Sequence, residues 1–167
     1  EDAEKAAWAR PEALDEARLV GRGLGPFLRV ELCEEEIALA ERGVAVRYLV
    51  DERWEVWVGR SNRENDELTH RASHGRDLWF HAQGVPGSHV ILRTDGRPEQ
   101  VPRRVIALAA CLAALHSKAR HAALVPVVWT ERRYVRKPRK AAPGTAVCLQ
   151  EKSLFVEPGG GPDVVPA

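Results

Sequence analysis

The segment from Val105 to Leu115 constrains the fold of this chain more than any other feature of the sequence. Every residue in it is apolar, and Pro102 just before it suits the first turn of a helix. A helix that is apolar almost all round is stable only when it is buried. We therefore expect a helix over residues 102–117 to form the buried centre of the fold, packed against a sheet.

Alternating patterns on both sides of this helix predict the strands of that sheet. The predicted strands cover residues 44–50, 55–58, 77–81, 89–93 and 124–129, and a closing hairpin covers 146–149 and 153–156. A short helix over 63–70 begins at a polar cap. The expected fold class is α+β, with a mixed β-sheet packed on one long buried helix.

The first 43 residues differ in pattern from the rest. Two helical patterns flank the glycines between positions 21 and 25, and the second is expected from Pro26 to about Leu32. Helix, glycine turn and helix are the outline of a helix-hairpin-helix, although any two packed helices need a similar turn. We expect a small helical segment over 1–43, a main domain over 44–156 and a disordered, Pro/Gly-rich tail over 157–167.

Composition limits the class of protein. Of the 167 residues, 44% are hydrophobic, which is enough for a core, and no apolar run is long enough to span a membrane. Cys33, Cys111 and Cys148 are odd in number and far apart, so they indicate a reducing compartment and we expect a cytoplasmic protein. No methionine occurs, even at position 1, which favours a fragment or a trimmed chain.

Charge is distributed unevenly along the chain. Residues 1–59 carry 8 Lys and Arg against 14 Asp and Glu, whereas residues 60–156 carry 17 against 8. The densest basic segment is an arm over residues 132–140, where Pro138 opposes helix formation and Tyr134 offers a ring for stacking. Its cations are Arg132, Arg133, Arg136, Lys137, Arg139 and Lys140. No apolar face accompanies them, so an arm that binds nucleic acid is favoured over one that binds a membrane.

The strand over 77–81 carries an unusual set of side chains. Leu78 and Phe80 alternate to the core, whereas Asp77, Trp79 and His81 point to the other face. An acid, an indole and an imidazole together would make a stacking surface with polar groups beside it. We expect Pro86 and Gly87 to form a turn that returns the chain and brings His89 close to His81.

The polar segment over 59–66 supplies further contacts. Arg60, Asn62 and Asn65 carry donors that suit phosphate, sugar and base edges. Capping of the helix that follows is an equally good interpretation for Asn65 and Asp66.

Other classes of function remain open at this point. The main alternative is an RNA-processing enzyme that uses Asp77, His81 and His89 as acid, base or metal site. A metal site is the minority interpretation, because His70 and His74 lack the glutamate and the thiolate pairs that zinc sites use. A third possibility is a protein-interaction module that docks a partner on the face of Trp79. We expect no catalytic residue, no metal and no cofactor.

Four motifs occur in the same order in one known family: Gly59–Asp66, Asp77–His81, Pro86–Val90 and Tyr134–Gly144. They resemble the NFACT-R domain, the RNA-binding C-terminal part of the fibronectin-binding protein A-like ribosome quality-control factors. The resemblance covers about Val44 to Val156, and the family's aspartate-tryptophan-histidine signature falls on Asp77, Trp79 and His81. The glycine turn near position 23 is similar to the family's helix-hairpin-helix.

The resemblance implies binding of tRNA and of rRNA in the obstructed large ribosomal subunit, in aid of tailing stalled nascent chains. The motifs include neither the family's N-terminal domain nor its coiled coil. A shortened or stand-alone member that uses RNA binding for another purpose therefore fits the sequence as well. The sequence does not indicate an oligomeric state.

Overall fold

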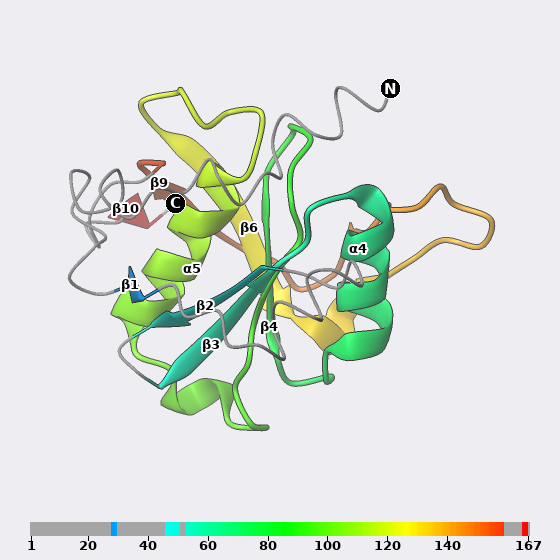
Figure 1. Cartoon of the computed structure of the whole chain (residues 1–167), viewed down its shortest axis with the longest axis horizontal. Helices are drawn as coiled ribbons and strands as arrows, with labels where there is room; N and C mark the ends of the chain where they lie inside the picture. Colours follow the sequence, from blue (N-terminus) through cyan, green and yellow to red (C-terminus); the bar gives the residue numbers. More distant parts are fainter. Residues whose placement is uncertain (1–27, 30–45, 51–52, 159–164, 167) are drawn as a thin grey trace.

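The computed structural model describes residues 28–29, 46–50, 53–158 and 165–166. Within this part of the chain, eight strands form one sheet in the order β1-β2-β3-β5-β4-β6-β9-β10, and α5 (Arg103–Leu115) packs against one face of it (Figure 1). The α+β class and the long buried helix are confirmed. The strands are β1 (Leu28–Arg29), β2 (Val46–Val50), β3 (Trp54–Val58), β4 (Leu78–Ala82), β5 (Val90–Leu92), β6 (Val125–Glu131), β9 (Lys152–Val156) and β10 (Val165–Pro166).

Shorter elements surround this sheet. The helix α4 (Asn62–Glu67) is capped by Ser61, whose hydroxyl accepts from the N–H of Glu64, and it runs on without a break into a π-helical turn. A separate two-stranded ladder pairs the segments on either side of residues 137–146. These elements are the π-helical η2 (Leu68–Ala72), the 3₁₀ turns η3 (Pro98–Gln100) and η4 (Arg132–Tyr134), and the ladder strands β7 (Val135–Arg136) and β8 (Val147–Cys148).

Every pair of strands among the described residues is antiparallel, whereas the sequence analysis expected a mixed sheet. The cause is the crossover through α5. The chain leaves β5, passes along α5 and enters β6, but β4 lies between these two strands and pairs with both. Strands β5 and β6 therefore run in the same direction without pairing.

The main core lies between the sheet and α5. Leu78 and Phe80 of β4 are 2% and 0% exposed and point to this face, as the alternation predicts. Leu108 and Leu112 of α5 meet them from the helix side, and the alanines between these residues let the helix lie close to the sheet. Each such large side chain contributes about 1.5–3 kcal/mol by its burial.

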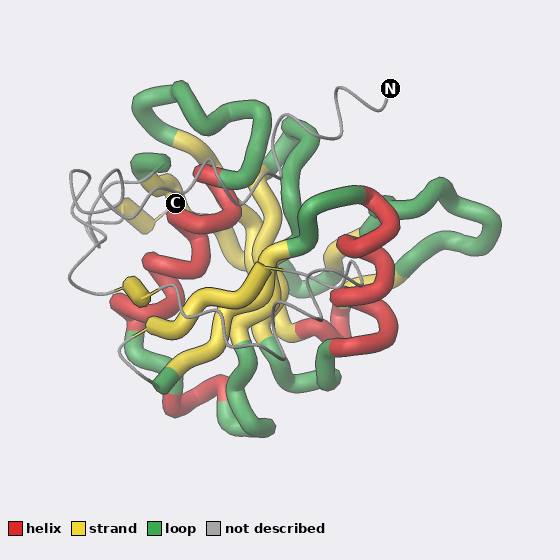
Figure 2. The backbone as a smooth tube through the Cα atoms, viewed as in Figure 1, coloured by secondary structure: helices red, strands yellow, loops and turns green. Residues whose placement is uncertain are grey.

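The opposite face of the sheet is also covered. Trp79, Ile91 and Val128 point to it and pack with Leu68 of η2 and Val135 of β7 in a second core. Figure 2 shows the strands between α5 on one side and α4 on the other. The stacking surface expected around Trp79 is therefore not open to a ligand, because α4, η2 and the β7–β8 ladder close over it.

The connection between β4 and β5 is not the turn that the sequence analysis placed at Pro86 and Gly87. The glycine with a positive φ is Gly84, at 74°. Gly87 instead lies in an antiparallel bridge with Ser117 just after α5, where a Cβ would come within 2.9 Å of the Ser117 Cβ. Gly87 thus allows a close approach of two segments, and no turn requires it.

The predicted closing hairpin is wrong in its pairing. β8 pairs with β7 and β9 pairs with β6, so the two segments join different ladders. Between them the chain turns at Gln150, which has a φ of 50°, and the hydroxyl of Thr130 donates to the carbonyls of Leu149 and Gln150. These contacts hold the turn against β6 and separate the two ladders.

Both ends of the chain lie largely outside the described residues. The predicted N-terminal helices fall there, except that Leu28–Arg29 form β1 against β2 where a helix from Pro26 to Leu32 was expected. Val165–Pro166, placed in a disordered tail by the sequence analysis, form β10 against β9. In both cases an outer strand of the sheet offers unpaired backbone groups that a passing segment satisfies.

Candidate nucleic-acid interface

Asp77 lies in the interior and its carboxylate is fully used there. It is 1% exposed and accepts from the N–H groups of His74, at 2.8 Å, and Thr94, at 3.0 Å. The Nε of Arg93 lies 3.2 Å from the same carboxylate. Asp77 therefore fixes the entry to β4 and the end of β5, and it has no oxygen left for a ligand.

Trp79, His81 and His89 form an aromatic cluster beside the second core. The rings of Trp79 and His81 are stacked with centroids 5.9 Å apart, and His89 meets both edge-on at 5.3 and 5.4 Å. The structure thus confirms that His89 lies close to His81. Trp79 is 3% exposed and His89 is 1% exposed, so neither offers a face to RNA, and His81 alone is partly exposed.

The two histidines of this cluster are neutral at pH 7. Burial, with a smaller contribution from the neighbouring His81, lowers the pKa of His89 to about 3. Burial also lowers the pKa of His81, although hydrogen bonds with the backbone of Ala82 and Gly87 work in the other direction. Neither ring supplies a positive charge for a phosphate.

His89 links three elements through its hydrogen bonds. Its Nε2 lies 3.1 Å from the carbonyl oxygen of Gly144, which accepts only, so the ring donates there. Its Nδ1 then accepts from the hydroxyl of Thr69 at 2.8 Å. Asn65, 1% exposed, accepts from the backbone N–H of His89 at 3.0 Å and donates to the carbonyl of Gly87 at 3.4 Å. Asn65 and His89 therefore hold the protein together internally.

The structure does not assemble Asp77, His81 and His89 into an acid–base site. Four residues along a strand separate Asp77 from His81 by about 13 Å. The Asp77 carboxylate is turned to Arg93 and Thr94, away from the histidine cluster.

No helix within the described residues is long and apolar enough to cross a membrane, and no three metal-binding side chains gather there.

Several predicted RNA contacts are instead structural. Arg60 pairs with Glu64, with Nη2 and Oε1 2.8 Å apart. Arg132 donates to the carbonyls of Thr69, at 2.6 Å, and His70, at 3.1 Å, and so joins η4 to η2. Two of the Arg132 donors are therefore used to hold η4 against η2.

Arg133 and Tyr134 contact each other at the start of the basic arm. The guanidinium of Arg133 pairs with Glu131 and lies 4.8 Å from the centre of the Tyr134 ring. Tyr134 is half-buried beneath it. A base would have to displace Arg133 before it could stack on this face of the ring.

The basic loop, residues 136–144, begins within the arm and extends past its end, and its cations face solvent. It connects β7 to β8 and extends past α4, drawn in orange in Figure 1. Arg136, Arg139 and Lys140 are exposed in it and make no ion pair within the described part of the chain. Lys137 pairs with Asp66 of α4. Asn62, at the start of α4, is exposed beside the loop and contacts Gly144.

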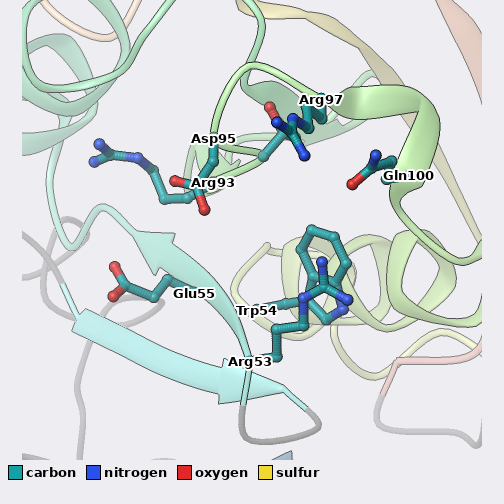
Figure 3. Close-up of a pocket in the computed structure, with 8 residues that line it drawn as sticks. Arg53, Trp54, Glu55, Arg93, Asp95, Arg97 and Gln100 are labelled. Atoms are coloured by element: carbon teal, nitrogen blue, oxygen red, sulfur yellow. The ribbon is translucent and has the colours of Figure 1, made fainter.

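A second cationic site lies between β3 and the segment after β5 (Figure 3). Arg53, Arg93 and Arg97 line a pocket there, and the guanidinium of Arg53 lies 4.5 Å from the centre of the Trp54 ring. Glu55 and Asp95 line the same pocket, so its charges largely offset each other. The sequence analysis missed this pocket, because its arginines come from separate segments and form no run.

The sequence profile of a family described as "NFACT protein RNA binding domain" matches residues 46–147. This range contains every residue of the candidate interface. The chain is also 40% identical over 103 residues to the Rqc2 homolog RqcH of Bacillus subtilis (strain 168), which is 62% of this chain and 17% of that protein. It is 41% identical over 113 residues to the Rqc2 homolog RqcH of Streptococcus suis (strain 05ZYH33), 67% of this chain and 20% of that protein.

A solved structure has a similar fold. It is described as the C-terminal of the fibronectin/fibrinogen-binding protein from Streptococcus suis, and it matches with a TM-score of 0.64 and 38% sequence identity. The match covers 68% of this chain and 46% of that one. The chain thus spans about a fifth of the curated relatives that it matches and less than half of this structure.

Proposed function

Because this chain belongs to the family of NFACT RNA-binding domains, we propose that it binds structured RNA and that the basic loop makes the phosphate contacts. The observation that carries the proposal is the group formed by Arg136, Arg139 and Lys140. These three cations are exposed on one loop, and no ion pair within the described residues neutralises them. Phosphate contacts of this kind supply most of the affinity for nucleic acid.

The binding is proposed to be non-catalytic. The signature residues Asp77 and Trp79 are buried, and the neutral His89 already uses both ring nitrogens in internal hydrogen bonds. These groups support the surface on which RNA would lie. His81 and Asn62, both at least partly exposed, are the polar side chains of the original set that remain available for contacts.

The finer part of the proposal concerns the RNA. Similarity to the two RqcH proteins supports a role in ribosome quality control. The RNAs that we propose, tRNA and the rRNA of the large ribosomal subunit, come from the motif resemblance described in the sequence analysis. The shape and charge of the loop suit a phosphate backbone and do not by themselves select one RNA.

Binding assays with ribosomal subunits and tRNA test this proposal. The chain is sedimented with isolated large and small subunits, and tRNA binding is measured by fluorescence anisotropy. The key variant carries Arg136→Gln, Arg139→Gln and Lys140→Gln. The matched control carries Arg53→Gln, Arg97→Gln and Arg103→Gln, which remove the same charge from exposed arginines outside the loop.

We expect the loop variant to bind tRNA roughly a hundredfold more weakly at physiological salt, because three phosphate contacts are lost. The control should stay within a few-fold of the wild type. Equal loss in both variants would mean that net charge alone drives binding and would contradict the proposed interface. Binding to the small subunit with none to the large one would contradict the proposed RNA.

A further inference from the structure

One acidic residue lies at the base of the basic loop and contacts both of its ends. The carboxylate of Asp66, in α4, pairs with the ammonium group of Lys137 near the start of the loop. Its Oδ1 accepts from the backbone N–H of Gly144 at 2.9 Å, at the end of the loop. Asp66 therefore joins two positions that are seven residues apart in the sequence.

Gly144 is also fixed by two further residues. Its carbonyl accepts from the Nε2 of His89 at 3.1 Å. Its φ is 86°, and a Cβ at this position would lie 2.8 Å from the Oδ1 of Asn62. Glycine is needed here both for the backbone conformation and for the contact with Asn62. The end of the loop is thus held by α4 and by the segment entering β5.

The chain between these anchors is folded into two turns. The N–H of Ala141 donates to the carbonyl of Pro138 at 3.1 Å, and that of Thr145 donates to Ala142 at 3.2 Å. Arg139 and Lys140 are the central residues of the first turn, and Lys140 has a φ of 60°. The loop therefore has a defined shape, with Arg139 and Lys140 in its first turn.

We propose that Asp66 is a positioning residue for RNA binding, whose carboxylate clamps the two ends of the basic loop and so presets Arg139 and Lys140 for phosphate contacts. This inference rests on the proposed function. A loop that is already ordered loses less conformational entropy when it binds, so the same contacts give a higher affinity. An acid in a basic surface therefore strengthens the binding of an anion.

Simple electrostatics predicts the opposite effect. Asp66 is a negative charge beside the phosphate-binding cations, and its removal alone should tighten RNA binding. Partial burial acts to raise the pKa of Asp66, but the hydrogen bonds from Lys137 and Gly144 and the charge of Lys137 outweigh it, so the pKa lies below its ordinary value. The carboxylate is therefore ionised at pH 7. Its removal should tighten RNA binding if only its charge matters, and should weaken RNA binding if it clamps the loop.

The neighbouring Glu67 provides a matched control. It lies on the same helix, carries the same charge and is exposed, but it pairs with Arg71, 3.6 Å away, and not with the loop. Alanine suits a helix at either position, so Asp66→Ala and Glu67→Ala change the charge equally with little effect on α4. A third variant, Gly144→Ala, releases the end of the loop without any change of charge.

The test measures the Kd for tRNA of these variants at one salt concentration. We expect Asp66→Ala and Gly144→Ala to weaken binding roughly five- to tenfold, and Glu67→Ala to leave it unchanged or tighten it slightly. Hydrogen exchange of the amides of residues 138–143 should become faster in the two weakened variants. An Asp66→Ala protein that binds as tightly as Glu67→Ala would overturn the inference.

Folding and the proposed function are controlled separately. Thermal unfolding shows whether each variant is folded at the assay temperature. If Asp66→Ala does not fold, the Gly144→Ala and Lys137→Gln variants carry the test, and unchanged exchange of 138–143 in both overturns the inference. If the Arg139→Gln, Lys140→Gln protein also binds as the wild type does, the proposed function fails. If that protein binds weakly while Asp66→Ala does not, only the clamp fails.

Discussion

Two regions of this molecule carry the polar residues that stand out in its sequence, and the structure uses them in opposite ways. Around β4, the carboxylate of Asp77, the indole of Trp79 and the imidazole of His89 are buried and contact their own neighbours. In the basic loop, Arg136, Arg139 and Lys140 face solvent. The difference teaches that a cluster of chemically capable residues can be the support of a site and not the site itself.

The two regions are also connected. His89, at the centre of the buried cluster, donates to the carbonyl of Gly144 at the end of the basic loop. Changes in the cluster should therefore affect stability first and RNA binding only through the loop. Changes in the loop should affect RNA binding and leave stability almost untouched.

The largest effect on stability is expected from Asp77→Ala. This change leaves the N–H groups of His74 and Thr94 and the guanidinium of Arg93 without their acceptor. We expect the free energy of unfolding to fall by about 3 kcal/mol, measured by urea denaturation. Glu99→Ala, at an exposed carboxylate, should change it by less than about 0.5 kcal/mol. Similar small effects from both variants would show that the Asp77 contacts are not needed.

The next largest loss of stability is expected from acid, which protonates the buried histidines on unfolding. The pKa of His89 is about 3 in the folded protein, against an ordinary value of 6.5, so the unfolded chain binds more protons between these values. The free energy of unfolding therefore falls as the pH decreases, by about 2 kcal/mol from pH 7 to pH 5 for this residue. His81, whose pKa is also lowered, acts in the same direction.

Urea denaturation at the two pH values measures this loss in the wild type and in His89→Gln. The variant is less stable at pH 7 but lacks the titrating ring, so its stability should fall much less with acid. Parallel pH profiles for the two proteins would contradict the assignment to His89.

Trp79→Phe separates the two regions most cleanly. Trp79 is buried and its Nε1 has no hydrogen-bond partner among the described residues, so the change removes ring volume but no hydrogen bond that the structure shows. We expect a loss of about 1–2 kcal/mol in the free energy of unfolding, followed by circular dichroism. The Kd for tRNA should stay within about twofold, since the ring lies beneath the surface. A large loss of affinity in the folded variant would show that Trp79 does contact RNA.

Lys140→Gln should change the free energy of unfolding less than Asp77→Ala, acid or Trp79→Phe does. The side chain is exposed and makes no ion pair within the described residues, so unfolding should shift by less than about 0.5 kcal/mol. The dependence of log Kd on log salt should nevertheless decrease by about one unit, because one phosphate contact is lost. A change in stability without a change in the salt dependence would place Lys140 with the buried cluster.

The fold was largely accessible from the sequence, because apolar periodicity reports burial directly. The helix near 102–117 and the alternation of Leu78 and Phe80 were both predicted from it. What escaped prediction depends on partners distant in the chain. The burial of Trp79 needs Leu68 and Val135 to close over it. The strand β8 cannot pair with β9, because both edges of β9 are occupied by β6 and β10, and it pairs with β7.

The site was accessible only in part, for the same reason. Basic density located the loop, but no local pattern could show that Arg132 is held by backbone carbonyls of η2 while Arg139 is exposed and makes no ion pair with another described residue. The contact between Asp66 and Gly144 joins residues 78 positions apart, so only the folded structure reveals it. Asn65 and Asp66 are adjacent polar residues in the same helix, and nothing in the sequence shows that Asp66 contacts the loop while Asn65 bonds to Gly87 and His89.

The most direct test of the central claim is the salt dependence of tRNA binding. Kd is measured over a salt series for the wild type, for the Arg136→Gln, Arg139→Gln, Lys140→Gln variant and for the control at Arg53, Arg97 and Arg103. If the basic loop is the RNA interface, the slope of log Kd against log salt decreases by about three units in the loop variant and stays close to the wild type in the control. Equal slopes for the wild type and the loop variant would contradict the account.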